Sequence, residues 1–236
     1  MLTMVYADIT LKAGSHNLLS GVNILEAEVV LAGYQRKPIR NSDDLPPCFS
    51  RVICDYVTGI NDAMPHAERQ KLKVFLGRLN GTRGTRKVEH ARAECLVMVT
   101  AKPAAVSALH SVGLHKYADA VEAATTLVEL EVAGWSAAKA AKAAKNGSSA
   151  VWPAAIAAEW ANRATDSAEV AAAAAAEWVV RWGGVGSYQY DWQPHIDALE
   201  AALKIGPQAP PIKPIVARER LRALREATGC DGKRRP

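Results

Sequence analysis

The sequence predicts an all-α protein, built as an irregular multi-helix assembly with a short strand or extended arm at its N-terminus. Apolar residues recur at three- and four-residue spacing through most of the chain, which is the pattern of amphipathic helices. Alanine tracts fill much of the second half, and alanine has the highest helix propensity. With 236 residues, of which 49% are hydrophobic, the chain is long enough to bury a core.

The first region, residues 1–126, is predicted to be helical with a basic segment. Met4 to Leu11 alternates apolar and polar residues, as a strand or extended arm does. Each later apolar stripe is bounded by Gly, Pro or Asn, and Pro103 is expected to interrupt one of them. Helices are expected over residues 23–31, 48–61, 65–80, 86–100, 104–110 and 116–124.

The second region, residues 127–205, is rich in alanine and tryptophan. Alanine tracts at 137–144, 154–158 and 171–176 predict helices that lack bulky side chains. Trp152 and Trp160, and likewise Trp178 and Trp182, are spaced so that each pair shares a helix face. The third region, residues 206–236, reads as a proline-rich linker followed by a basic helix, about 216–227, and a charged tail.

The cysteine pattern and the hydropathy favour a cytoplasmic protein with no membrane partner. Cys48, Cys54, Cys95 and Cys230 have no short ligand spacing, so free thiols in a reducing compartment are expected. No apolar run approaches the roughly 18 residues of a membrane span. We predict no cofactor.

Positive charge is concentrated in two blocks. Residues 66–92 hold eight basic and two acidic residues, and residues 213–236 hold eight and three, on an otherwise acidic chain. The start of the helix after Gly81–Thr85 offers backbone N–H groups to a phosphate, and arginines share one face of the C-terminal helix. The candidate phosphate or nucleic-acid contacts are Arg78, Arg83, Arg86, Lys87, Arg218, Arg222 and Arg225. The competing interpretation is that both blocks are solvated faces.

A set of polar residues in the first third contains the side-chain types that bind divalent metals. Its members are His16, Glu26, Asp43, Asp44, Cys48, Asn61 and Asp62. They are far apart in the sequence, and helix caps and turns explain them equally well. No Ser-His-Asp or Cys-His arrangement is recognisable, so no catalytic residue is assigned.

Residues 16–85 resemble a family of uncharacterised proteins of bacteriophages and bacterial genomes. The resemblance is carried by Gly14–His16, Glu26–Ala27, Ala32–Gly33, Pro47–Cys48, Val52–Ile53, Asn61–Asp62 and Leu79–Thr85. It implies a phage or prophage origin. The family pattern has a Cys and a His-Pro pair where this chain has Asn23 and Leu45, which counts against a metal site built on those positions.

Three classes of function follow from these observations. The leading hypothesis is a non-enzymatic phage or prophage accessory protein that binds another protein, because any exposed Trp on an alanine-rich helix is a natural contact residue. The alternative is a nucleic-acid-binding protein that uses residues 66–92 and 213–236. A metal-dependent enzyme built on His16, Glu26, Asp44 and Cys48 is the remote third.

Overall fold

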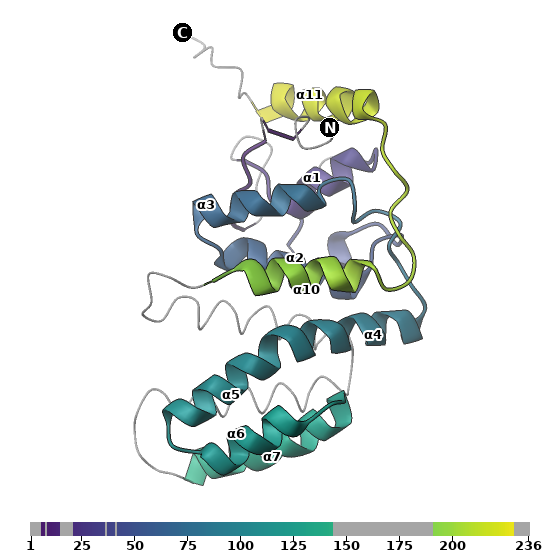
Figure 1. Cartoon of the computed structure of the whole chain (residues 1–236). Helices are drawn as coiled ribbons and strands as arrows, with labels where there is room; N and C mark the ends of the chain where they lie inside the picture. The colour runs from purple at the N-terminus through teal and green to yellow at the C-terminus, as the bar shows by residue number, and fades with distance from the viewer. Residues whose placement is uncertain are drawn as a thin grey trace.

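The computed structural model confirms the all-α fold class (Figure 1). It describes residues 6–7, 9–14, 21–35, 37–40, 42–143 and 191–228. In these ranges there is no strand, and Leu11 forms only an isolated parallel bridge with Val22. The alanine tracts at 154–158 and 171–176, with Trp152, Trp160, Trp178 and Trp182, lie outside the described residues.

Helices α1 (Ile24–Leu31) and α2 (Arg51–Ala63) form the centre of the N-terminal region. Asn23 and Glu26 close a capping box at the start of α1, and all eight residues of α1 are buried. Ser50 caps α2 by accepting a hydrogen bond from the N–H of Ile53, so α2 begins three residues later than predicted. A 3₁₀ turn, η2 (Ser42–Asp44), precedes it.

The helix predicted over 65–80 is wrong in type and length. A single α-helical turn, α3 (His66–Arg69), continues as a 3₁₀ helix, η3 (Gln70–Phe75). The helix ends at Leu76, whose backbone is extended, and the chain turns at Gly77, whose φ of 81° favours glycine. The N–H of Gly77 donates instead to the carboxylate of Glu28 on α1.

Pro103 does not interrupt the next helical segment, contrary to the sequence prediction. Helix α4 (Arg86–Leu96) passes through a π-helical turn, η4 (Val97–Ala101), into α5 (Lys102–Ser111). Lys102 donates its N–H five residues back to Val97, and Pro103 falls in the first turn of α5, where a missing N–H costs little. Helices α6 (His115–Ala123) and α7 (Leu127–Ala143) then pack as successive hairpins.

The sequence prediction missed helix α10 (Gln193–Leu203), which packs against α2, α4 and η4. Figure 1 shows α10 between the N-terminal helices and α4, with α5, α6 and α7 forming the layer beyond. The last helix, α11 (Pro214–Thr228), lies against α1. The core beneath these helices includes Phe49, Ile53, Tyr56 and Phe75.

Two further sequence predictions concern thiols and membranes. Cys48, Cys54 and Cys95 are free thiols, as predicted, and Cys230 lies outside the described residues. Among the described helices, none is both long and apolar enough to cross a membrane.

Candidate functional site

Helix α7 carries a stripe of exposed apolar side chains. Leu127, Leu130 and Ala137 are buried where α7 packs on α6 and its neighbours. Val128 and Val132 are each 65% exposed, and Trp135 is 54% exposed. Their spacing of four and three residues places them on one face of the helix. We define the α7 stripe as Val128, Val132 and Trp135.

The start of α7 is held by a side-chain cap. The carboxylate of Glu129 accepts hydrogen bonds from the N–H groups of Thr125 and Thr126 at 2.7 and 3.1 Å and from the Thr125 hydroxyl at 2.7 Å. These bonds lower the pKa of Glu129 below its ordinary value. The cap fixes the first turn of the helix that presents the α7 stripe.

Three of the eight cations of the 66–92 block hold the fold together. Arg69 is buried and donates to the carbonyls of Asn61 and Met64. Arg78 makes a two-pronged ion pair with Glu200 of α10, at 2.7 and 2.8 Å. Arg92 is fully buried. Part of the positive charge in this block is therefore explained by tertiary packing.

The helix N-terminus predicted to bind phosphate already has a carboxylate. Glu89 is buried at the start of α4, where it accepts hydrogen bonds from the N–H of Gly84 at 2.9 Å and the hydroxyl of Ser50 at 2.5 Å. Arg92 donates to the same carboxylate at 3.1 Å. An internal anion thus takes the favourable position at the helix dipole.

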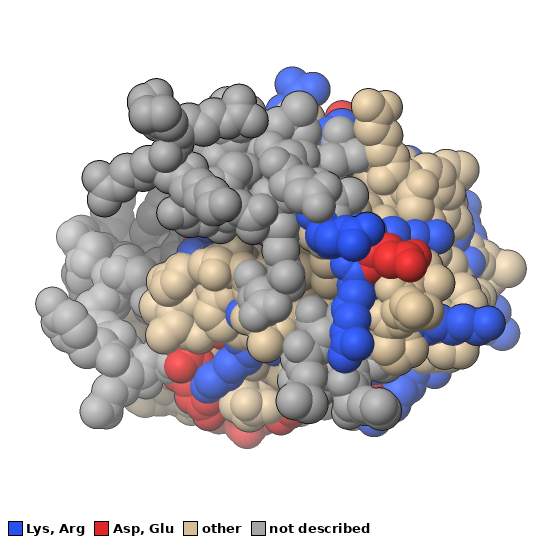
Figure 2. Space-filling view, turned by 90° about the horizontal axis from the view of Figure 1, so that it is seen from above, with Lys and Arg blue, Asp and Glu red and all other residues tan. Residues whose placement is uncertain are grey.

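The remaining candidate cations lie on the surface in two separate places. Arg83, Arg86 and Lys87 are exposed around the first turn of α4, whereas Arg218 and Arg222 are exposed on α11. The side chain of Arg225 lies outside the described residues. On the face seen in Figure 2, the described Lys and Arg side chains alternate with acidic and uncharged surface. Nucleic-acid contact by these residues stays a prediction.

The described members of the polar set form a helix cap, a turn and contacts between distant segments. Glu26 accepts a hydrogen bond from the N–H of Asn23 at 3.0 Å. Asp44 accepts one from the N–H of Arg40 at 2.9 Å, and Asp62 accepts one from the N–H of Gly14 at 2.7 Å. Asn61 donates to the carbonyl of Lys12, and Cys48 to the side chain of Asn80. Asp43 lies 3.8 Å from Arg51, and His16 lies outside the described residues.

The sequence prediction missed a buried carboxylate, Glu28, in the middle of α1. It accepts hydrogen bonds from the N–H groups of Gly77 and Leu79 and lines a cavity of about 230 Å³ beside Lys213 and Arg220. Burial raises the pKa of Glu28 to about 7, although the backbone donors pull it down. The signal in the sequence is an acidic residue inside an apolar helical run, where a solvated face is not available.

Comparison with family models, with curated proteins and with solved structures found no match to this chain. The resemblance of residues 16–85 to phage proteins therefore stays a prediction.

Proposed function

We propose that this chain is a non-enzymatic accessory protein, of phage or prophage origin, that binds another protein through the α7 stripe. The observation that supports the proposal is the set of three large apolar side chains exposed together on one face of α7. The phage or prophage origin rests on the resemblance of residues 16–85 alone.

The stripe has the geometry of a helix that docks into a groove. Contacts of that kind use anchors at positions i, i+4 and i+7 of one helix, as Val128, Val132 and Trp135 are spaced. Tryptophan is the side chain most enriched among residues that dominate binding energy. Trp135 is thus the principal contact residue of the proposal.

The charge along the stripe defines the partner further. Glu131 is three residues after Val128 and four before Trp135, so it lies beside the stripe on the same side of the helix, and it is half-buried. A partner groove that covers the stripe must pair this carboxylate or leave it desolvated, which is costly. The proposed partner is therefore a protein with an apolar groove and a basic residue opposite Glu131.

We expect loss of binding when the stripe is changed. Proteins are captured from a lysate of the source cell on tagged wild-type protein and on the tagged variants Val132→Asp and Trp135→Ala. The captured proteins are then identified. A partner retained by the wild type is then purified and titrated by calorimetry. Trp135→Ala should weaken its binding by at least about 2 kcal/mol, the threshold of a dominant contact residue. Glu131→Lys should weaken it as well, because it places two cations face to face.

The matched control is Val74→Asp, which changes a valine of η3 that is 50% exposed on another surface. This variant should bind as the wild type does. If a purified partner binds the wild type and the three stripe variants equally, the α7 stripe is not its binding surface. A wild-type dimer that Val132→Asp converts to monomer, measured by light scattering, identifies a second copy of this chain as the occupant and overturns the proposal of a different protein.

Nucleic-acid binding is the second candidate, supported by the exposure of Arg83, Arg86 and Lys87 together at the first turn of α4. It predicts binding to duplex DNA in which the logarithm of affinity falls by about 0.9 per neutralised phosphate with the logarithm of salt. Replacing all three with alanine should reduce that slope by about 3 in fluorescence anisotropy titrations. An unchanged slope in the triple variant removes these residues from the interface.

A further inference from the structure

Four side chains of metal-ligating types lie together on the neighbouring helices α5 and α6. His115, Asp119 and Glu122 are four and three residues apart on α6, so they share one face of that helix. The helix packs on α5 through a short turn in which Gly113 has a φ of 77°. The turn brings His110, in the last turn of α5, to the same face.

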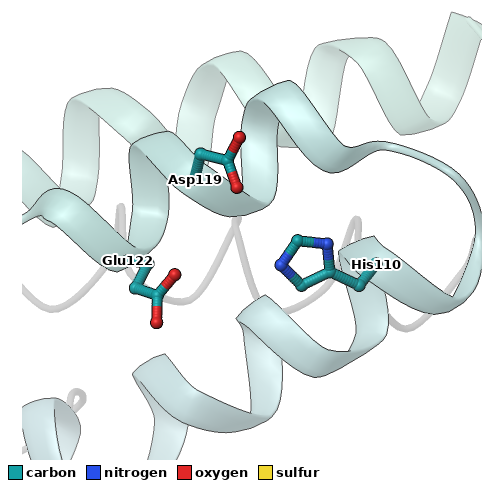
Figure 3. A group of neighbouring side chains, drawn as sticks. All are labelled: His110, Asp119 and Glu122. Atoms are coloured by element: carbon teal, nitrogen blue, oxygen red, sulfur yellow. The ribbon is translucent and has the colours of Figure 1, made fainter.

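Three of these side chains converge closely enough to share an ion. One ligand atom each from His110, Asp119 and Glu122 lies within 4.8 Å of the others. Figure 3 shows the imidazole of His110 directed toward the space between the two carboxylates. Ligand atoms about 2.0–2.2 Å from a zinc ion are about 3–4 Å apart, so small side-chain rotations close the set.

His115 orients the imidazole of His110. The Nδ1 atoms of the two rings are 2.9 Å apart, within hydrogen-bond distance. This bond occupies Nδ1 of His110 and leaves Nε2 for an ion. Histidines that bind metals almost always use the second nitrogen in this way, and the partner fixes the tautomer and ring orientation.

We propose that His110, Asp119 and Glu122 bind a divalent transition ion, Zn²⁺ foremost, and that His115 is the positioning residue of the site. One imidazole and two carboxylates without a thiolate suit the borderline ion Zn²⁺ and the harder Mn²⁺ better than soft ions. Asp119 and Glu122 are exposed, so the ion keeps coordination positions open to water or to a further ligand. The site shares no residue with the α7 stripe, so the proposal does not rest on the proposed function.

Calorimetric titration of Zn²⁺ into chelator-treated protein without a histidine tag tests the site. We expect one ion per chain in the wild type, and loss of that binding in the Asp119→Asn/Glu122→Gln double variant. His115→Ala should weaken binding about 10- to 100-fold while keeping the stoichiometry, as expected for the partner of a metal ligand. The changed side chains are exposed, so circular dichroism should show unaltered helix content.

The control variant is His66→Ala, an exposed histidine on α3, which should bind Zn²⁺ as the wild type does. Because cysteine thiolates are general Zn²⁺ ligands, the comparison between variants decides the result. Absence of binding in the wild type overturns the proposal. So does Zn²⁺ binding that the double variant leaves unchanged, since the ion is then held elsewhere.

Discussion

Replacing Arg92 with methionine should lower the free energy of unfolding by about 3–5 kcal/mol, the cost of breaking a buried ion pair from one side. Arg92 has no exposed surface. It donates to the carbonyls of Thr82, Ile205 and Pro207 at 2.5, 2.9 and 3.0 Å and to the Glu89 carboxylate at 3.1 Å. Methionine fills similar volume but leaves these acceptors without their donor.

Replacing Arg92 should also weaken the other hydrogen bonds that Glu89 accepts. The Ser50 hydroxyl that donates to Glu89 also accepts from the N–H of Ile53, so the network joins the starts of α2 and α4. Arg92 also connects this network to the segment after α10, because it donates to the carbonyls of Ile205 and Pro207. The segment predicted as a linker is therefore attached to the body of the protein at its beginning.

Urea unfolding at pH 7 measures this effect. Arg86→Met is the matched control, because Arg86 is exposed on the same helix, and it should change stability by no more than about 0.5 kcal/mol. In the Glu89→Gln/Arg92→Met double variant the total loss of stability should be less than the sum of the two single losses. Each single variant leaves one buried charge without its partner, whereas the double variant removes both charges. An Arg92→Met loss no larger than that of the control contradicts the proposed role.

Stability should also depend on pH through two buried groups that act in opposite directions. His195 is buried on α10, with its Nδ1 2.9 Å from the Tyr56 hydroxyl and its ring against Trp192. Burial lowers the pKa of His195 to about 4, from an ordinary value of 6.5. Burial raises the pKa of Glu28 from 4.5 to about 7.

The sign of each contribution follows from which state binds more protons. Between pH 4 and 6.5 the unfolded chain protonates His195 more readily than the folded protein does, so this residue makes stability rise with pH. Between pH 4.5 and 7 the folded protein holds a proton on Glu28 that the unfolded chain loses, so this residue makes stability fall with pH. Each contribution amounts to about 3 kcal/mol over its full range.

We expect the two slopes to oppose each other in the wild type and to separate in the variants. Relative to the wild type, His195→Gln should become less stable as pH rises from 4.5 to 6.5, because the Glu28 contribution is then unopposed. Glu28→Gln should show the reverse trend. Unfolding free energies from urea titrations at pH 4.5, 5.5 and 6.5 measure both, and parallel curves for the three proteins contradict these pKa values.

Two of the helix starts that the local pattern predicts correctly have caps that are also local. Asn23 with Glu26, and Thr85 before α4, are within three residues of the groups they bond. The start of α4 was therefore predicted at the right residue. Pro103 misled the prediction because proline usually ends a helix, whereas here a π-helical turn and the first turn of α5 accommodate it.

The candidate sites depend more on contacts between distant segments. The spacing of His115, Asp119 and Glu122 is readable in the sequence, yet only the turn between α5 and α6 adds His110. In the same way, Arg78 and Arg92 of the basic block at 66–92 each bond to residues more than 100 positions away. A count of charges does not separate such side chains from exposed ones like Arg83.

By itself the sequence determined the all-α class and most of the helices, because helical periodicity, caps and glycine stops act over a few residues. Only the tertiary structure decided which arginines are buried, that Glu28 and Glu89 are buried carboxyl groups, and that Trp135 is exposed while Trp192 is buried. Burial and pairing depend on neighbours brought together by packing, and two identical residue types in similar local patterns then acquire opposite roles.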